Sequence, residues 1–257
     1  MRKIYRMSGK VGIKRYLSGE EAVNYEGAVD LFKSSPIPDD QIFSNLGLFL
    51  NSKDLSRILF MDFLYRQIID LQGVVMDFGT RWGHNMAIFS ALRGIYEPFN
   101  RHKLIVGFDT FSGFPRISRK DGRSDLMTAG NISVTKNYED YLDRVMKFQE
   151  GSNPLSHIKK YELRKGDASV ETVKYLKERP ETIVALAYFD FDIYEPTKNC
   201  LQAILPHLVK GSVVAFDELN DHDSPGETLA LKEVLGLNNI KLRRLPITSR
   251  TSYFVFE

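Results

Sequence analysis

The chain has 257 residues, of which 43% are hydrophobic and 26% are charged, and its formal net charge is only +2. This length and composition suffice for one globular domain with a hydrophobic core. A net charge this small excludes the strongly basic surface typical of nucleic-acid-binding proteins, so we expect no nucleic-acid partner.

The cysteine content and the lack of long apolar runs indicate a cellular location. Cys200 is the single cysteine, which rules out an internal disulfide and fits a reducing compartment; its place in the apolar pattern CLQAIL predicts a buried core residue. The basic stretch MRKIYRMSGK is followed by no hydrophobic segment, and no run of about 18 apolar residues occurs. We therefore expect a cytoplasmic protein with no membrane partner.

The pattern of the chain changes near residue 73. Residues 1–36 are mixed and polar, and the stretch SSPIPDD (34–40) is a proline-containing break. Residues 41–71 carry apolar side chains at helical spacing, which predicts two helices, the second of them amphipathic.

After Gly73 the chain alternates between strand patterns and helix patterns. The expected strands cover residues 74–78, 103–109, 160–167, 183–192, 212–218, 241–246 and 252–257, and the expected helices cover 82–96, 169–179 and 196–208. This alternation indicates an α/β fold with a mostly parallel, seven-stranded sheet that is covered by helices on both faces. The last two strands are expected to form an antiparallel hairpin at one edge.

Acidic residues lie at the carboxyl end of each of the first five expected strands. They are Asp77, Asp109, Asp167, Asp190, Asp192, Asp217 and Glu218. Because ligands of open α/β sheets bind outside the carboxyl ends of the strands, these side chains should meet at one binding edge. Any single one of them could instead be a turn former or a helix cap.

The loop after the first strand, GTRWGHN (79–85), contains two glycines. Gly79 and Gly83 would let the backbone pass close to a ligand, although the same spacing also suits a simple tight turn. The dinucleotide fingerprint G-x-G-x-x-G is absent, which disfavours pyrophosphate binding. Asp109, at the end of the next strand, could accept both hydroxyls of a ribose. Together these residues indicate a nucleoside cofactor without a long phosphate chain.

Four segments carry a further signal: GVVMDFGTRWGHN (73–85), IVGFDTFSGFP (105–115), YFDFDIYEPT (188–197) and VVAFDELN (213–220). They resemble the macrocin O-methyltransferase family, whose members use S-adenosylmethionine to methylate sugar hydroxyls in natural-product and surface-glycan pathways. The resemblance implies a Rossmann-like class I methyltransferase domain over residues 73–257 and a helical lid or oligomerisation segment over residues 1–72. It also implies a sugar or nucleotide-sugar substrate and a homodimer.

The resemblance assigns binding roles to individual residues. For S-adenosylmethionine these are Asp77, Gly79 and Gly83 at the methionine end, Asp109, Thr110 and Phe111 at the ribose, and Asp167 and Ala168 at the adenine. The implied magnesium ligands are Asp190, Asp217 and Glu218. The family commonly has Asp-Asp at the last two positions, so here the longer Glu218 could still reach an Mg²⁺ ion, or the metal could be absent.

Transfer of a methyl group to a hydroxyl also requires a proton acceptor. The catalytic candidates are Asp190, which would act through the cation, and Asp192 or His222, either of which would take the proton. Asp192 could instead cap the following helix, and His222 could be an exposed loop residue. Glu227 could cap the helix after it or touch the substrate.

The loop RISRKDGRSDLMTAGN (116–131) is long for a connection in an α/β fold, and such loops are often lids or substrate-binding elements. Its basic residues could bind the phosphates of a nucleotide-sugar or form a solvated surface; they are Arg116, Arg119, Lys120 and Arg123. Two other functions stay open beside the methyltransferase: a nicotinamide-dependent oxidoreductase, which the missing fingerprint disfavours, and a catalytically silent binding module, which the crowded acidic edge disfavours.

Overall fold

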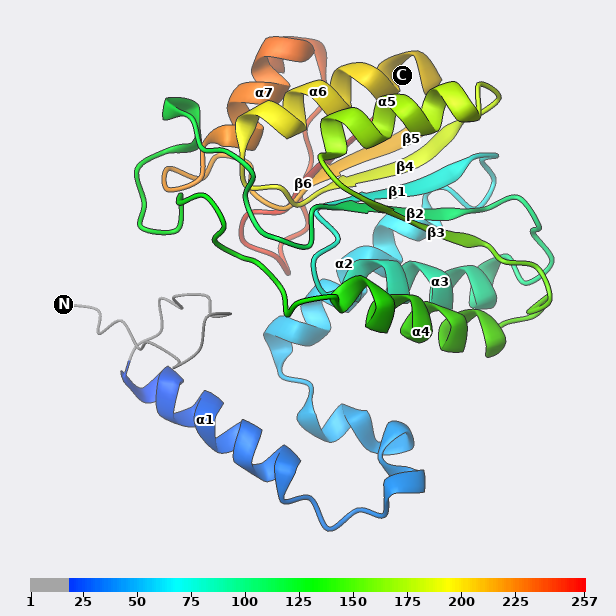
Figure 1. Cartoon of the computed structure of the whole chain (residues 1–257), viewed down its shortest axis with the longest axis vertical. Coiled ribbons are helices and arrows are strands. Elements are labelled where there is room, and N and C mark those ends of the chain that lie inside the picture. Colours follow the sequence, from blue (N-terminus) through cyan, green and yellow to red (C-terminus); the bar gives the residue numbers. More distant parts are fainter. Residues whose placement is uncertain (1–18) are drawn as a thin grey trace. The chain divides into compact units, whose positions relative to one another are not determined.

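The structure is a computed structural model that describes residues 19–257, and its contacts divide the chain into two units, residues 1–57 and 58–257 (Figure 1). The described elements of the first unit are α1 (Gly19–Lys33), 3₁₀-helices at Asp39–Gln41 and Phe43–Phe49, and the start of α2 (Ser52–Arg66). Residues 41–71 therefore contain the two expected helices, of which the first, Phe43–Phe49, is a 3₁₀-helix. The first segment, FSNLGLF, contains Asn45 and Gly47, which have low helix propensity.

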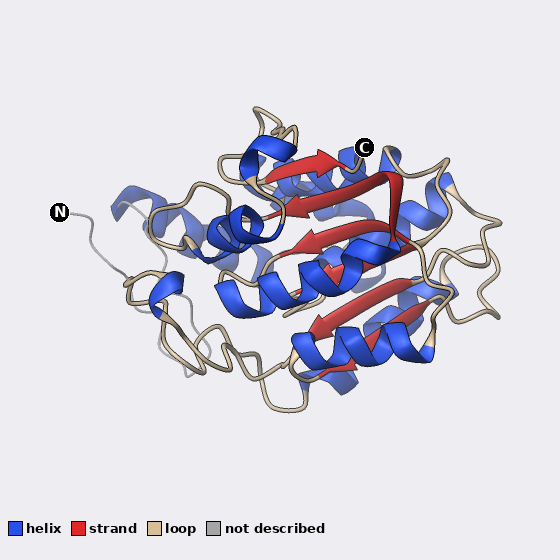
Figure 2. Ribbon diagram, turned by 90° about the horizontal axis from the view of Figure 1, so that it is seen from above, coloured by secondary structure: helices blue, strands red, loops and turns tan. Residues whose placement is uncertain are grey.

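The second unit is built on a sheet whose strands have the order β3-β2-β1-β4-β5-β6. These strands are β1 (Val74–Phe78), β2 (Ile105–Asp109), β3 (Tyr161–Lys165), β4 (Val184–Phe189), β5 (Leu208–Phe216) and β6 (Ser252–Val255). The first five are parallel and β6 is antiparallel to β5, so that in Figure 2 one arrow at the edge of the sheet runs against the others. Because β1 lies between β2 and β4, it marks the point at which the strand order reverses.

Over residues 58–257 the sheet has six strands, and the expected seventh, residues 241–246, is not one of them. In this segment only Arg243 pairs, in an isolated bridge with Tyr253 whose two hydrogen bonds both measure 2.8 Å. Pro246 has no backbone N–H to continue a ladder and lies in a turn that leads the chain away. The side chain of Leu242 consequently stays 43% exposed.

Helices cover both faces of the sheet (Figures 1 and 2). One face is covered by the end of α2, α3 (His84–Tyr96) and α4 (Tyr138–Gly151), and the other by α5 (Ala168–Glu178), α6 (Tyr194–Ile204) and α7 (Gly226–Val234). In β1, Val75 packs on the α2–α4 side, whereas Val74 and Met76 pack on the α5–α7 side. The expected α/β fold with a mostly parallel sheet is confirmed, although the sequence patterns did not predict α1 or α4. No helix described between residues 19 and 257 is long and apolar enough to span a membrane.

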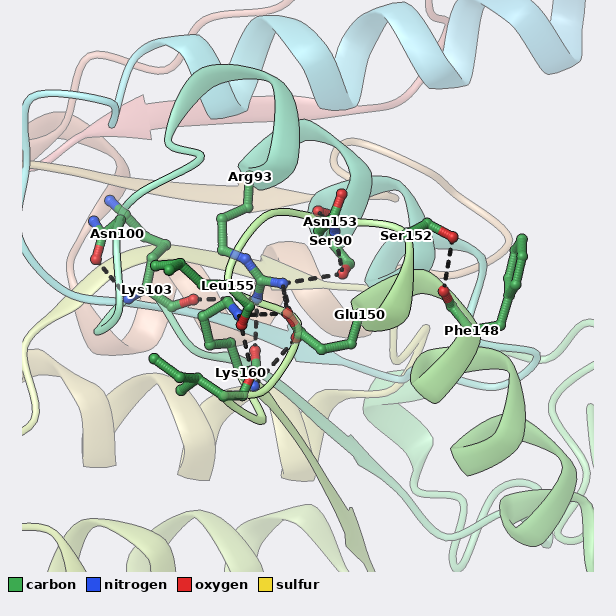
Figure 3. Close-up of polar contacts among 11 residues, drawn as sticks. Ser90, Arg93, Asn100, Lys103, Phe148, Glu150, Ser152, Asn153, Leu155 and Lys160 are labelled. Atoms are coloured by element: carbon green, nitrogen blue, oxygen red, sulfur yellow. Dashed lines mark hydrogen bonds and ion pairs between the residues drawn. The ribbon is translucent and has the colours of Figure 1, made fainter.

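Charged side chains are buried at the amino-terminal edge of the sheet (Figure 3). The guanidinium of Arg93, on α3, donates to both carboxylate oxygens of Glu150, on α4, at 2.8 and 2.9 Å, and to the Lys160 carbonyl at 2.7 Å. The Lys160 ammonium lies 2.5 Å from Glu150 Oε1, and each of the three residues is at most 4% exposed. One carboxylate thus serves two buried cations and joins α3, α4 and the start of β3, at the end of the sheet opposite the acidic strand ends.

Candidate active site

Four phenylalanine rings form a ladder across the sheet, each at or next to the carboxyl end of its strand. In spatial order from β2 to β5 they are Phe108, Phe78, Phe189 and Phe216, and adjacent centroids are 5.0, 4.6 and 5.1 Å apart. The strand register places each ring directly beside the next. The residues after the rings therefore reach the same edge; they are Asp109, Gly79, Asp190 and Asp217.

β1 and β4 meet at the centre of this carboxyl edge. The Asp190 amide donates to the Phe78 carbonyl at 2.8 Å, and a Cβ added to Gly79, whose φ is +85°, would lie 2.0 Å from the Asp190 carbonyl oxygen. The close approach of two strand ends thus requires Gly79, quite apart from any ligand. Asp77 is 0% exposed, and its Oδ1 accepts a hydrogen bond from Asn85 Nδ2 at 3.1 Å.

The loop between β1 and α3 is held by α4. A Cβ added to Gly83, whose φ is +78°, would lie 2.2 Å from Cδ1 of Leu142. The Trp82 ring packs edge to face on Tyr138 at 4.7 Å, and the Tyr138 hydroxyl donates to the Trp82 carbonyl at 3.0 Å. Packing against Leu142 therefore requires glycine at position 83, quite apart from any ligand. The sequence pattern did not indicate this contact.

Asp109 ties together the loops that follow β1 and β2. Its Oδ2 accepts from the Arg81 amide at 2.8 Å and its Oδ1 from the Phe111 amide at 2.5 Å. Burial raises the pKa of Asp109 although both amides act in the opposite direction. Each carboxylate oxygen has a second acceptor position for a ligand hydroxyl. The turn beside it is closed by Thr110, whose hydroxyl donates to the Gly113 carbonyl at 2.8 Å.

Asp167 acts as the N-cap of α5, because its Oδ1 accepts from the Ser169 amide at 2.9 Å. Its side chain is exposed, whereas Ala168 is buried. The loop that carries Asp167 adjoins the end of β2, since the Gly166 amide donates to the Asp109 carbonyl at 2.9 Å. Asp167 is therefore a helix cap, which was one of the alternatives for the acidic residues at the strand ends. Its loop lies next to Asp109.

Carboxylates gather at the ends of β4 and β5, where Asp190, Asp192, Asp217 and Glu218 form what we call the acidic rim. The Tyr188 hydroxyl donates to Asp217 Oδ1 at 2.6 Å, and Arg250 Nη2 lies 2.6 Å from Glu218 Oε1. Burial and then the neighbouring charge of Asp192 raise the pKa of Glu218 well above its ordinary value. Asp192 has a φ of +60° and does not cap α6, which begins without a side-chain cap.

The acidic rim has the chemistry of a cation site but not the arrangement of a formed one. Among residues 19–257, no group of three or more His, Cys, Asp or Glu side chains is placed to hold a metal ion. Glu218 Oε2, however, is buried and makes no hydrogen bond. A buried acceptor in this state is costly, and carboxylate oxygens are the ligands that Mg²⁺ prefers, so the donor set fits this ion.

His222 and Glu227 lie in contrasting environments, one fully exposed in the loop after β5 and the other buried in the first turn of α7. His222 is fully exposed, and its Nδ1 lies 3.7 Å from Asp223 Oδ1, which matches the alternative of an exposed loop residue. Glu227 is 0% exposed and does not cap α7. Its carboxylate instead accepts hydrogen bonds from the backbone amides of Phe191 and Glu218, at 2.9 and 3.2 Å. These contacts join segments that are distant in the sequence, so no local pattern indicates them.

The long connection after β2 is anchored near its middle. Asp121 is 2% exposed and accepts from the Ser118 and Tyr194 amides, both at 2.5 Å. The Lys120 ammonium lies 3.8 Å from the centroid of the Tyr194 ring and 2.9 Å from Glu233 Oε2 on α7. The remaining basic side chains of this connection are exposed: Arg116, Arg119 and Arg123.

Comparison with models of protein families gave no match, and comparison with curated proteins gave none. Among solved structures, the calicheamicin methyltransferase CalS11 is 43% identical to the chain, with a TM-score of 0.91, and the match covers 93% of this chain and 94% of CalS11. A second structure, described as apo CalS11, TDP-rhamnose 3'-O-methyltransferase, is 41% identical with a TM-score of 0.83, over 93% and 96% of the two chains. The chain belongs to the S-adenosylmethionine-dependent sugar O-methyltransferases. Its cofactor is accordingly S-adenosylmethionine.

The O-methyltransferase NovP shares the fold, with 16% identity and a TM-score of 0.57 over 78% of this chain and 79% of NovP. The expected family, the class I methyltransferase fold and the enzyme class are thus confirmed, with six strands in place of seven. The residues that were assigned by resemblance lie at or beside the carboxyl ends of β1, β2, β3, β4 and β5.

Proposed function

We propose that the chain methylates a hydroxyl of a nucleotide-linked deoxysugar in the biosynthesis of a natural product or a surface polysaccharide. The observation that carries this proposal is the acidic rim, which lies on the same strand edge as Asp109 and the loop of Gly79. A relative described as a TDP-rhamnose 3'-O-methyltransferase, 41% identical, supports a sugar nucleotide as acceptor.

For the cofactor we propose the end of β1 as the methionine site, the end of β2 as the ribose site and the start of α5 as the adenine site. The residues assigned to these sites are Asp77, Gly79 and Gly83; Asp109, Thr110 and Phe111; and Asp167 and Ala168. Support comes from the position of β1 at the reversal of strand order, where α/β proteins open a crevice for ligands. The exposed cap Asp167 and the partly buried Asp109 would then lie at opposite ends of the nucleoside.

Asp192 is the proton acceptor that the geometry favours. Methyl transfer forms an oxygen–carbon bond and breaks the sulfur–carbon bond of the sulfonium, so that S-adenosylhomocysteine leaves and the hydroxyl proton must be taken up. Asp192 lies in the acidic rim, whereas His222 is fully exposed at the surface. A positioned base of this kind contributes about 10²- to 10⁴-fold to the rate.

A magnesium ion bound by Asp190, Asp217 and Glu218 is part of the proposal. It is supported by the buried Glu218 Oε2, which makes no hydrogen bond, and by the carboxylate donor set. When bound, the ion would stabilise negative charge on the acceptor oxygen. Removal of divalent cations with a chelator should then lower the transfer rate and added Mg²⁺ should restore it; full activity of the stripped protein would argue against the ion.

Exposed apolar side chains in residues 19–57 support a homodimer. Large apolar side chains are exposed on α1 and on the 3₁₀-helix that follows, with Leu31 at 69%, Phe43 at 74% and Leu48 at 71%. Exposed apolar surface of this kind favours association with a second copy. We accordingly propose that residues 1–72 act as a lid and oligomerisation segment. We also propose that the enzyme is cytoplasmic and has no nucleic-acid partner. Light scattering of the wild type and of Phe43→Ser would test this, because only the variant should elute as a monomer.

The acceptor class is tested by a panel of sugar substrates. Methyl-labelled S-adenosylmethionine is offered together with TDP-linked deoxyhexoses, the corresponding free sugars and simple glycosides. Label should pass only to the nucleotide-linked sugars if the exposed Arg116, Arg119 and Arg123 bind the diphosphate. Transfer to glycosides at equal rates would show that the nucleotide is not recognised.

A further inference from the structure

We propose that Glu227 is a positioning residue for methyl transfer, because its buried carboxylate holds the ends of β4 and β5 at the spacing that the acidic rim requires. Glu227 is the second residue of α7 and has no role in cofactor binding, cation binding or proton transfer in the function proposed above. The inference rests on that function, since it concerns how the reacting edge is kept in place.

Both carboxylate oxygens of Glu227 accept hydrogen bonds from the backbone of the rim. Oε1 accepts from the Phe191 amide at 2.9 Å and from the Asp192 amide at 3.4 Å, and Oε2 accepts from the Glu218 amide at 3.2 Å. The side chain is 0% exposed, so it acts from beneath the rim and not on a substrate. One carboxylate thus joins the loop after β4 to the loop after β5.

The loop after β4 needs such a support because its backbone is strained at the proposed base. Asp192 has a φ of +60°, a left-handed conformation that residues other than glycine rarely adopt. Strain of this kind persists only where the surroundings hold it. Gly226 contributes, since an added Cβ would lie 2.8 Å from the Asp192 carbonyl oxygen and 2.6 Å from the Tyr194 amide nitrogen. The first turn of α7 therefore lies directly against this backbone, with Glu227 bound to its amides.

The contact requires a side chain with two acceptor oxygens. A glutamine has the same shape as Glu227 but offers one acceptor and one donor in place of two acceptors. In Glu227→Gln the side-chain NH₂ must face either the Phe191 amide or the Glu218 amide. Both groups are hydrogen-bond donors, so this hydrogen bond is lost. One of the two loops is then released while the packing of α7 is retained. A displacement of about 1 Å among reacting groups can cost on the order of 100-fold in rate.

The test compares Glu227→Gln and Glu227→Asp with Leu231→Ala, a control variant on the same helix. Leu231 is 0% exposed and packs in the core on the α5–α7 side, so its truncation destabilises α7 without removing a contact to the rim. Three quantities are measured: amide hydrogen exchange in peptides that cover residues 189–193 and 216–220, the affinity for S-adenosylhomocysteine, and kcat and KM for methyl transfer.

In Glu227→Gln the amide hydrogens of at least one of the two peptides should exchange faster than in the wild type, and kcat should fall about 100-fold. The affinity for S-adenosylhomocysteine should be unchanged. Glu227→Asp keeps both acceptor oxygens and should lose less kcat than Glu227→Gln. If the glutamine variant does not fold, the exchange rates and kcat of Glu227→Asp are compared with those of Leu231→Ala instead. Leu231→Ala should keep its kcat. A kcat loss shared equally by Leu231→Ala would overturn the inference, because general destabilisation would then explain it.

The exchange measurement separates this inference from the proposed function, because it needs neither acceptor nor cation. Unchanged exchange at both peptides in Glu227→Gln would overturn the positioning role while leaving methyl transfer by the wild type intact. Absence of transfer by the wild-type protein to any sugar nucleotide would instead overturn the proposed function, and the catalytic part of the inference with it.

Discussion

The hydroxyl of Tyr188 donates a hydrogen bond of 2.6 Å to Oδ1 of Asp217, and both residues are buried. Tyr188 belongs to β4, whereas Asp217 directly follows β5. The bond thus orients one carboxylate of the acidic rim from the neighbouring strand. Partners of this kind matter in proteins because they fix the direction in which a ligand-binding carboxylate points.

Replacement of this phenol gives the first prediction. Tyr188→Phe should lower the rate of methyl transfer about 10- to 100-fold and leave the affinity for S-adenosylhomocysteine unchanged. Tyr65→Phe is a matched control, since the Tyr65 hydroxyl also donates to a carboxylate at 2.6 Å, that of Glu97. Both variants should lose a similar free energy of unfolding, about 1.5–3 kcal/mol, but only the first should lose activity. Equal kcat losses in the two variants would contradict an orienting role.

The buried charges at the amino-terminal edge give a prediction about stability. Glu150→Ala leaves the cations of Arg93 and Lys160 buried without their carboxylate, and should cost about 3–5 kcal/mol in the free energy of unfolding. Glu178→Ala removes an exposed partner of Arg164 and should cost less than about 1 kcal/mol. Urea unfolding of both variants measures the difference. A loss below about 1 kcal/mol in Glu150→Ala would mean that this network contributes little.

The single cysteine gives a prediction about pH dependence. Burial raises the pKa of the Cys200 thiol to about 12 from an ordinary value of 9.0. Because only the thiolate reacts, and because Cys200 is 0% exposed and its pKa is raised, labelling of the native protein should stay far slower than that of the unfolded protein from pH 8 to pH 10, although both rates increase with pH. Labelling is followed with a chromogenic disulfide, with the urea-unfolded protein as reference. Labelling of the native protein at a rate close to that of the unfolded protein at pH 9 would show that the thiol is accessible.

Much of the fold could be predicted from the sequence because buried parallel strands are continuous apolar runs. The strands that end at Phe78 and at Asp109 were placed for this reason. The segment 241–246 was misjudged, because its alternating pattern says nothing about the turn that Pro246 makes in the folded chain.

The site was only partly predictable. The acidic strand ends were visible as a pattern, and a Phe before Asp or Gly at four of them could have revealed the aromatic ladder. Contacts between distant segments leave no local pattern, which is why the bonds of Glu227 and the anchoring of Asp121 emerge only from the structure. For the same reason, the packing of Leu142 against Gly83 could not be foreseen.

The most direct test of the account is calorimetric titration of the protein with S-adenosylhomocysteine, with Asp109→Ala measured alongside. Asp109 is the residue we propose to bind the ribose, and it also holds the Arg81 and Phe111 amides. The account predicts micromolar affinity, about −8 kcal/mol, for the wild type and its loss in the variant. No binding by the wild type, or equal binding by the variant, would contradict the cofactor site at the ends of β1 and β2.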